Sequence, residues 1–374
     1  MWLLFLAFLL HGTSAEQAPG VSTALFASLE RLARLVDISY CIGYTGIRKP
    51  FDCLSRCTEF PNVTLSKTWS TGMFMTDSCG YIAVDETPSS KVAIDSHGAI
   101  IVAFRGTYSI ANTVVDLSTI PQKYVPYPSD SDGPAHKCTN CTVHMGFFKA
   151  WESAKESVIP SLIELRRTHP SKPIHLVGHS LGGAVACLAG LELKTTLGLD
   201  NIVVTTFGEP RVGNSDLVDF INSVFALNGK TDLEKQSYRR ITHTNDPVPL
   251  LPPGEWAYKS HGGEIHITKS ELSPGEEDLQ LCIGSGDEKC SAGQDSKSQS
   301  LVHLTEFYEG IAGSKLQKRG FPTRLKLWQL FFAHRDYFWR LGLCLPGGDP
   351  ADWGRGRPAE VEAEVKEEAE YQEL

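Results

Sequence analysis

A short apolar strand that runs through two closely spaced glycines into an alanine-rich helix constrains this chain more than any other stretch. Residues 174–194 read IHLVGHSLGGAVACLAGLELK, with Ser180 between Gly178 and Gly182. Glycines there let strand and helix approach closely around a serine with a strained backbone. Such a serine is either part of a structural turn or a nucleophile at a helix N-terminus, where free N–H groups favour an oxyanion. Because Gly-x-Ser-x-Gly at a strand-to-helix junction is typical of a nucleophile elbow, we predict that Ser180 is catalytic.

Apolar strands alternate with amphipathic helices along the rest of the chain. Leu25, Leu29, Leu32 and Val36 share one stripe of a helix expected over 21–37. The predicted inner face of a second helix, over 146–169, consists of Phe148, Trp151, Val158, Leu162 and Leu165. Strands are expected within 81–86, 99–107, 174–180, 201–214 and 238–253. This alternation predicts an α/β fold with a largely parallel sheet covered on both faces.

The charge of the chain excludes some partners. The formal net charge is −9 over 374 residues, which argues against nucleic acid or an anionic membrane surface as a partner. Much of this charge is local, because residues 360–374 hold seven Glu and one Lys. We therefore expect an acidic, solvated or disordered tail over 346–374.

The first fifteen residues, MWLLFLAFLLHGTSA, predict secretion. Nine apolar residues from Trp2 to Leu10 precede small residues ending at Ala15, as in a signal peptide cleaved there. Nine residues are too few to cross the ~30 Å hydrocarbon core of a bilayer, so we expect an extracellular protein without a stable membrane span. The sequons at Asn62 and Asn140 are predicted glycosylation sites.

The ten cysteines fit an oxidising compartment. Three pairs of cysteines are close in sequence: Cys53 with Cys57, Cys138 with Cys141, and Cys282 with Cys290. Cys41 and Cys344 lie near the two ends of the globular region, and a bridge between them would join those ends. Cys79 and Cys187 remain as free thiols. Cys138-Thr-Asn-Cys141 resembles half of a zinc site, but no second pair follows at ligand spacing, so no metal is expected.

A catalytic serine needs a base, and the base needs an orienting acid. The order in this kind of sheet is Ser, then Asp or Glu, then His. Asp246, in ITHTNDPVP just past an expected strand end, is the predicted acid; the alternative is a turn-forming Asp before Pro247. Four histidines follow it, and their order does not choose among them: His261, His266, His303 and His334.

Several motifs occur together in one order along the chain: FRGT (104–107), VHMGF (143–147), LVGHSLGGA (176–184), FGEPRVGN (207–214), NDPVPLLPP (245–253) and HRDYFWRLGLC (334–344). With them, the chain from about Leu25 to Cys344 resembles the secreted fungal class 3 lipases. The resemblance implies an α/β-hydrolase fold for a single domain over 16–345, with a short helical lid. The eight cysteines paired above look like the four-disulfide pattern of the yeast-type members.

The resemblance also selects a base. In that family the catalytic His opens a His-x-x-Tyr-Phe segment that closes on the last cysteine, which here implies His334. The segment HLTEFYEG at His303 matches this pattern less well, although His303 lies 57 residues after Asp246, a separation nearer that of compact family members. The longer gap to His334 implies inserted sequence at about 291–330, in or beside a polar, Gly/Ser-rich surface loop that we place at about 273–323.

Two further features are implied by the family. The oxyanion hole would use Thr107 and the backbone N–H of Leu181. The segment 108–117 would be the lid, with Ile110, Val114 and Val115 on an apolar face that lies over the site when closed and meets lipid when open. The alternative is that these three residues belong to an ordinary core helix.

Together these features predict a secreted, monomeric serine esterase that hydrolyses triacylglycerols at lipid–water interfaces through an acyl-enzyme and without a cofactor. The alternatives within the fold are a phospholipase A1 and a feruloyl-type esterase. A catalytically silent lipid-binding protein is a further alternative, which the presence of nucleophile, acid, base and oxyanion residue disfavours. An inactive product of a wrong gene model, with 291–330 as spurious sequence, is the last.

Overall fold

The centre of the protein is an eight-stranded sheet in the order β12-β11-β10-β9-β8-β5-β4-β3. A computed structural model describes residues 20–72, 76–87, 98–107, 121–124, 138–227, 235–295 and 332–346. Strands β5, β8, β9, β10 and β11 are parallel, and β3, β4 and β12 join antiparallel at the two edges. The bounds are β3 Val63–Ser70, β4 Cys79–Asp85, β5 Ile100–Phe104, β8 Ile174–His179, β9 Ile202–Phe207, β10 Tyr238–His243, β11 Glu264–Ile267 and β12 Leu279–Leu281. Two small antiparallel pairs lie outside it: β1 Ile47–Arg48 with β2 Asp52–Cys53, and β6 Pro121–Lys123 with β7 Thr142–His144.

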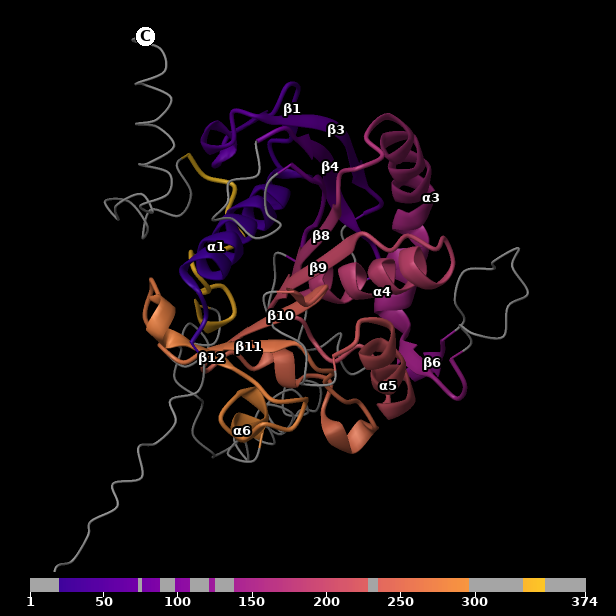
Figure 1. Ribbon diagram of the computed structural model, residues 1–374, viewed down its shortest axis with the longest axis vertical. Helices are drawn as coiled ribbons and strands as arrows, with labels where there is room; N and C mark the ends of the chain where they lie inside the picture. Colours follow the sequence, from indigo (N-terminus) through magenta and orange to yellow (C-terminus); the bar gives the residue numbers. More distant parts are fainter. Residues whose placement is uncertain are drawn as a thin grey trace, which may run out of the picture.

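Helices cover both faces of the sheet (Figure 1). Helix α1 lies on one side, and α3, α4 and α5 lie on the other. Their bounds are α1 Thr23–Ile38, α3 Met145–Thr168, α4 Leu181–Thr195 and α5 Ser215–Val224, and a short helix α6 spans Ser291–Asp295. Each face buries its own apolar cluster, one built around α1 and one around α3 and α4. The predicted α/β architecture, with a mostly parallel sheet, is therefore confirmed.

The apolar stripes of the two long helices are largely as predicted. All four residues of the α1 stripe are buried. In α3, Trp151, Val158 and Leu162 are buried, but Phe147 takes the inner position expected for Phe148. Phe148 instead packs half-buried against Tyr124, with ring centroids 6.1 Å apart. Phe147 lies within the helix four residues before Trp151 and therefore shares its inner face.

Helix α1 holds the C-terminal segment 332–346 against the sheet. The Trp339 indole N–H donates to the Glu30 carboxylate, and the Gly342 N–H donates to Asp37 Oδ1 at 2.8 Å. The disulfide Cys41–Cys344 joins the same two regions across 303 residues of sequence. We call these three links the terminal clamp.

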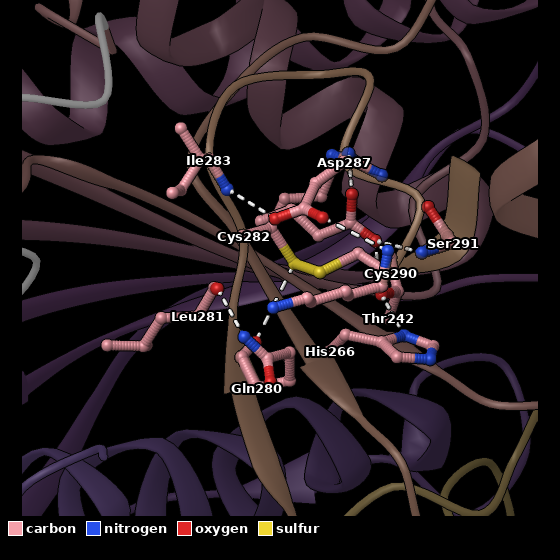
Figure 2. Close-up of a disulfide and its surroundings, with 12 residues drawn as sticks. Thr242, His266, Gln280, Leu281, Cys282, Ile283, Asp287, Cys290 and Ser291 are labelled. Carbon is pink, nitrogen blue, oxygen red and sulfur yellow. Dashed lines mark hydrogen bonds and ion pairs between the residues drawn. A yellow bond between two sulfur atoms is a disulfide. The ribbon is translucent and has the colours of Figure 1, made fainter. Parts of the chain in front are cut away.

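The segment 273–295, expected as a loop, contains regular structure. Residues 279–281 form β12, which pairs with β11 and covers that edge of the sheet. The disulfide Cys282–Cys290 closes a small loop beside Thr242 and His266 (Figure 2). After it, the Ser291 N–H donates to the buried Glu264 carboxylate at 3.1 Å. An edge strand of three residues has too short an alternation to stand out in a polar sequence.

One buried acid between α3 and α4 gives a pH-dependent prediction. Glu192 accepts the Trp151 indole N–H, and burial raises the pKa of its carboxyl to about 7. This pKa lies above the value of an unfolded glutamate, so the group stabilises the fold at low pH and loses that contribution as pH rises through about 7. The shift corresponds to at most about 3 kcal/mol of the free energy of unfolding.

Glu192→Gln is expected to remove this dependence, because the amide oxygen can still accept from Trp151 and carries no charge. Urea unfolding of both proteins from pH 5 to pH 8 should therefore show the variant gaining stability relative to the natural chain as pH rises. Glu164→Gln, on the exposed face of α3, is the matched control and should follow the natural chain. If the free energy of unfolding changed with pH in the same way for all three proteins, Glu192 would not be the source of the pH dependence.

Candidate active site

Ser180 lies at a sharp turn between β8 and α4. Its φ and ψ are 57° and −130°, a region that non-glycine residues rarely occupy. A Cβ on Gly178 would lie 2.1 Å from the Gly182 carbonyl oxygen, and one on Gly182 would lie 2.3 Å from that of Phe104. The turn can therefore close only with glycine at both positions, as the sequence predicted.

His334 and Asp246 form a buried acid–base pair. The His334 Nδ1 lies 3.0 Å from both carboxylate oxygens of Asp246. Because a carboxylate accepts, Nδ1 carries the proton, and Nε2 of the neutral ring is left as a proton acceptor. Within the described residues, neither His334 Nε2 nor Ser180 Oγ has a hydrogen-bond partner. The arrangement thus offers an unoccupied base nitrogen and an unoccupied hydroxyl, each able to serve acyl transfer.

Backbone and side-chain donors fix the orientation of Asp246, which lies just past β10. The Val248 N–H donates to Oδ1 at 2.9 Å, and the Tyr337 hydroxyl donates to Oδ2 at 2.5 Å. Burial and the Asp246 charge hold the pKa of Tyr337 well above its ordinary value, so the hydroxyl remains a donor. Tyr337 belongs to the His-x-x-Tyr-Phe segment noted in the sequence. Its hydrogen bond to Asp246, 91 residues away, could not be predicted from the residues around either side chain.

A glycine lies directly under this pair. Gly208 follows β9 with φ of +59°, and a Cβ there would lie 3.0 Å from His334 Cε1 and 3.1 Å from Asp246 Oδ2. Any larger residue would combine backbone strain with a collision against the Tyr337 hydroxyl, at 2.6 Å, and tight contacts with both members of the pair. The FGEPRVGN motif therefore serves the site through its first glycine.

The two expected oxyanion residues come from neighbouring parallel strands. Phe104 pairs with Gly178 in the β5–β8 register, so residues 105–107 leave the sheet beside the elbow. A Cβ on Gly106 would lie 2.9 Å from Ser180 Cβ, which measures how closely the segment before Thr107 approaches the serine. Leu181 is the first residue of α4, where backbone N–H groups have no partner inside the helix.

The rival histidines occupy other networks. His261 Nε2 lies 2.9 Å from Glu209 Oε1, and His266 Nδ1 lies 2.8 Å from the Thr242 hydroxyl. Burial lowers the pKa of His266 to about 4, which keeps that ring neutral. Among the histidines that the structure describes, only the His334 ring hydrogen bonds to the Asp246 carboxylate; His303 lies outside the described residues.

His179 and, through it, Tyr40 connect to His334, and sequence reasoning singled out neither residue. His179, inside the elbow, donates from Nε2 to the His334 carbonyl oxygen at 2.8 Å and lies 2.5 Å from the Tyr40 hydroxyl through Nδ1. Its position before the serine was visible in the motif. Its partners, 139 and 155 residues away in sequence, were not.

One group of metal-type donors occurs in the described residues: the side chains of Cys187, Glu209 and His261, all buried. The Glu209 carboxylate accepts from Thr206 at 2.6 Å and from Tyr238 at 2.7 Å, besides its contact with His261. These hydrogen bonds satisfy the carboxylate within the core. No helix in the described part of the chain is long and apolar enough to cross a membrane.

The remaining expectations divide into those that fall on described residues and those that do not. The disulfides pair Cys41–Cys344, Cys53–Cys57, Cys138–Cys141 and Cys282–Cys290, as the resemblance implied, and Cys79 and Cys187 are free and buried. Asn62 and Asn140 are exposed, and their glycosylation remains a prediction. The signal peptide (1–15), the lid with Ile110, Val114 and Val115, most of the inserted sequence and nearly all of the acidic tail lie outside the described residues.

Known proteins with the same features are fungal lipases. The family described as Lipase (class 3) matches residues 101–256. Secreted mono- and diacylglycerol lipase 2 of Gibberella zeae is 57% identical over 366 residues, covering 92% of this chain and 88% of that protein. Lipase A of Sodiomyces alcalophilus is 54% identical, covering 95% of this chain and 92% of that protein. The crystal structure of the Lip2 lipase from Yarrowia lipolytica superposes with a TM-score of 0.67 at 26% identity, over 87% of this chain and 97% of that one.

Proposed function

The chain belongs to the fungal class 3 lipase family and is a secreted carboxylic ester hydrolase, and from this premise we propose that it hydrolyses acylglycerols with Ser180 as nucleophile, His334 as base and Asp246 as orienting acid. The observation that carries the proposal is the Asp246–His334 pair, which leaves His334 Nε2 as an acceptor. The strained conformation of Ser180 at the helix N-terminus supports it further.

In the proposed mechanism, His334 Nε2 takes the Ser180 proton as Oγ attacks the ester carbonyl. The negative charge that develops on the carbonyl oxygen is stabilised by the N–H groups of Leu181 and Thr107. His334 then gives its proton to the leaving glycerol oxygen, which produces an acyl-enzyme. Water repeats the sequence and releases the fatty acid. Asp246 holds the ring in one tautomer and stabilises its charged form throughout.

We further propose that mono- and diacylglycerols are among the substrates, because the relative that is 57% identical carries those substrates in its name. Emulsions of mono-, di- and triacylglycerol with one acyl chain should be compared by titrating released fatty acid, with Ser180→Ala as the blank. Release from the mono- and diacylglycerol is expected. Release of fatty acid from the triacylglycerol alone would overturn the proposal that mono- and diacylglycerols are substrates. It would still agree with the prediction of triacylglycerol hydrolysis. Turnover of only phosphatidylcholine or methyl ferulate would favour the phospholipase or feruloyl-esterase alternative.

The lid at 108–117 and action at an interface belong to this proposal. The rate on a short-chain ester should rise steeply once its concentration exceeds its solubility, because an apolar lid face is then stabilised by the interface. A hyperbolic dependence of the rate on ester concentration, with no break at the solubility limit, would contradict a role for the lid. It would still agree with a serine esterase. Sedimentation of the purified protein would test the expectation of a monomer.

A further inference from the structure

The hydroxyl of Tyr40 contacts the elbow at His179 and the segment before Thr107 at Gly106, and His179 extends this contact to the segment that carries His334. We propose that Tyr40 and His179 are positioning residues, which together hold the backbone of His334 and of Gly106 in register with Ser180. The inference rests on the proposed catalytic roles and adds two residues that touch neither substrate nor reacting atoms.

The hydrogen bonds of His179 have only one consistent direction. His179 Nε2 lies 2.8 Å from the His334 carbonyl oxygen, which can only accept, so Nε2 carries the ring proton. In the neutral ring Nδ1 is then an acceptor, and the Tyr40 hydroxyl, at 2.5 Å, must donate to it. A chain of two hydrogen bonds thus runs from Tyr40 through His179 to the backbone of His334.

The same hydroxyl also meets the segment before the oxyanion residue. The Gly106 backbone lies directly against the Tyr40 hydroxyl. A Cβ on Gly106 would lie 2.4 Å from that hydroxyl and 2.7 Å from the His179 carbonyl oxygen, so only glycine allows this approach. Tyr40 therefore connects the segment that leads to Thr107 with the residue that holds His334.

Burial keeps this chain neutral and fixes its direction. Desolvation, with a smaller contribution from the nearby His334, holds the pKa of His179 well below its ordinary value. Desolvation likewise raises the pKa of Tyr40, against the opposing charges of Arg335 and Arg105. Neutrality matters because the rings of His179 and His334 lie 4.7 Å apart, and His334 becomes cationic during the proposed reaction. A charged His179 would oppose that step.

Tyr40 is itself held firmly. It is buried in the short helix η1, Ser39–Cys41, directly after α1 and beside the cysteine that bonds Cys344. A rigid support of this kind lets one hydroxyl define the position of two backbone segments. Tyr44, four residues further on, is 73% exposed and offers a matched control for the loss of a phenolic hydroxyl.

The test is Tyr40→Phe beside Tyr44→Phe, assayed on a soluble short-chain ester to separate chemistry from interface binding. Tyr40→Phe is expected to lower kcat about tenfold at temperatures where the variant is folded, the equivalent of one hydrogen bond, with KM close to that of the natural chain. Tm should fall modestly, because His179 Nδ1 then lies buried without a donor. Tyr44→Phe should change neither kcat nor KM. His179→Gln, whose amide can still donate to the His334 carbonyl, should also lower kcat. The double variant should lose no more than the larger single loss, because both residues act in one chain of bonds.

An unchanged kcat in Tyr40→Phe, or additive losses in the double variant, would overturn the proposal. A loss of activity that appears only at temperatures where the variant unfolds would also overturn it, since Tyr40 would then be a merely structural residue. If Tyr40→Phe does not fold, the kcat of His179→Gln decides in its place. Labelling with a phosphonate ester separates this inference from the proposed function. One label per chain on Ser180, acquired more slowly in Tyr40→Phe, is expected. A label elsewhere in the natural chain would refute Ser180 as nucleophile whatever Tyr40 does.

Discussion

His334→Ala is expected to lower kcat for a soluble ester by about 10⁴-fold or more, while His303→Ala leaves kcat within about twofold of the natural chain. Without an imidazole at 334, nothing takes the Ser180 proton as the bond to carbon forms, and nothing donates to the leaving alcohol. Asp246→Asn should cost a comparable factor, because the amide holds the ring in the wrong tautomer.

His303→Ala is the control for this prediction, since both histidines precede an aromatic pair and both follow Asp246 in sequence. The measurement is single-turnover and steady-state hydrolysis, with circular dichroism and Tm to establish that each variant folds. A collapse of activity in His303→Ala together with an active His334→Ala would transfer the base to His303. Equally small decreases of kcat in both variants would contradict a catalytic triad that uses either histidine.

Removal of the disulfide between the ends of the domain is expected to have the largest effect on stability. Cys41→Ser with Cys344→Ser frees a loop of 303 residues, for which the chain-entropy account gives a loss of about 5 to 6 kcal/mol in the free energy of unfolding. Cys282→Ser with Cys290→Ser frees only 8 residues and should lose about 2 to 3 kcal/mol. The smaller loop is the matched control, because both variants replace one buried disulfide by two hydroxyls.

Urea unfolding of the three proteins under identical oxidising conditions measures the difference. We also expect the Cys41–Cys344 variant to lose activity at lower denaturant than the Cys282–Cys290 variant, since its bridge lies in the segment that carries His334. Equal losses of stability would show that loop length does not set the effect. A smaller loss for the long loop would mean that the remaining links of the terminal clamp hold the ends together without the bridge.

The nucleophile and its acid could be predicted from the sequence because each has a local cause. Ser180 requires glycines at fixed positions around a strand–helix turn, and Asp246 follows an apolar strand at the edge where parallel strands present polar groups. His334 could not be chosen by spacing, since four histidines followed the acid, and a family motif was needed to favour it. The structure then brings it to Asp246 across 88 residues.

The features that sequence reasoning missed depend on contacts between distant segments. Tyr40 and His179 are 139 residues apart, and neither residue type in its own neighbourhood indicates a shared hydrogen bond. Phe147 and Phe148 could not be told apart by helical period, because residues four and three positions before Trp151 can both share its face of the helix. Strand β12 lies in a polar, glycine-rich stretch, and its pairing with β11 rather than its own composition makes it a strand.

The terminal clamp has a consequence for how this chain tolerates change. Glu30, Asp37 and Cys41 fix the segment around His334 through links that do not pass through the residues preceding it in sequence. We therefore expect that sequence between α6 and residue 332 can lengthen or shorten during evolution without moving the base. For the same reason, a protease that cut within 296–331 would leave two polypeptides covalently joined through Cys41 and Cys344, with all three proposed catalytic residues still assembled.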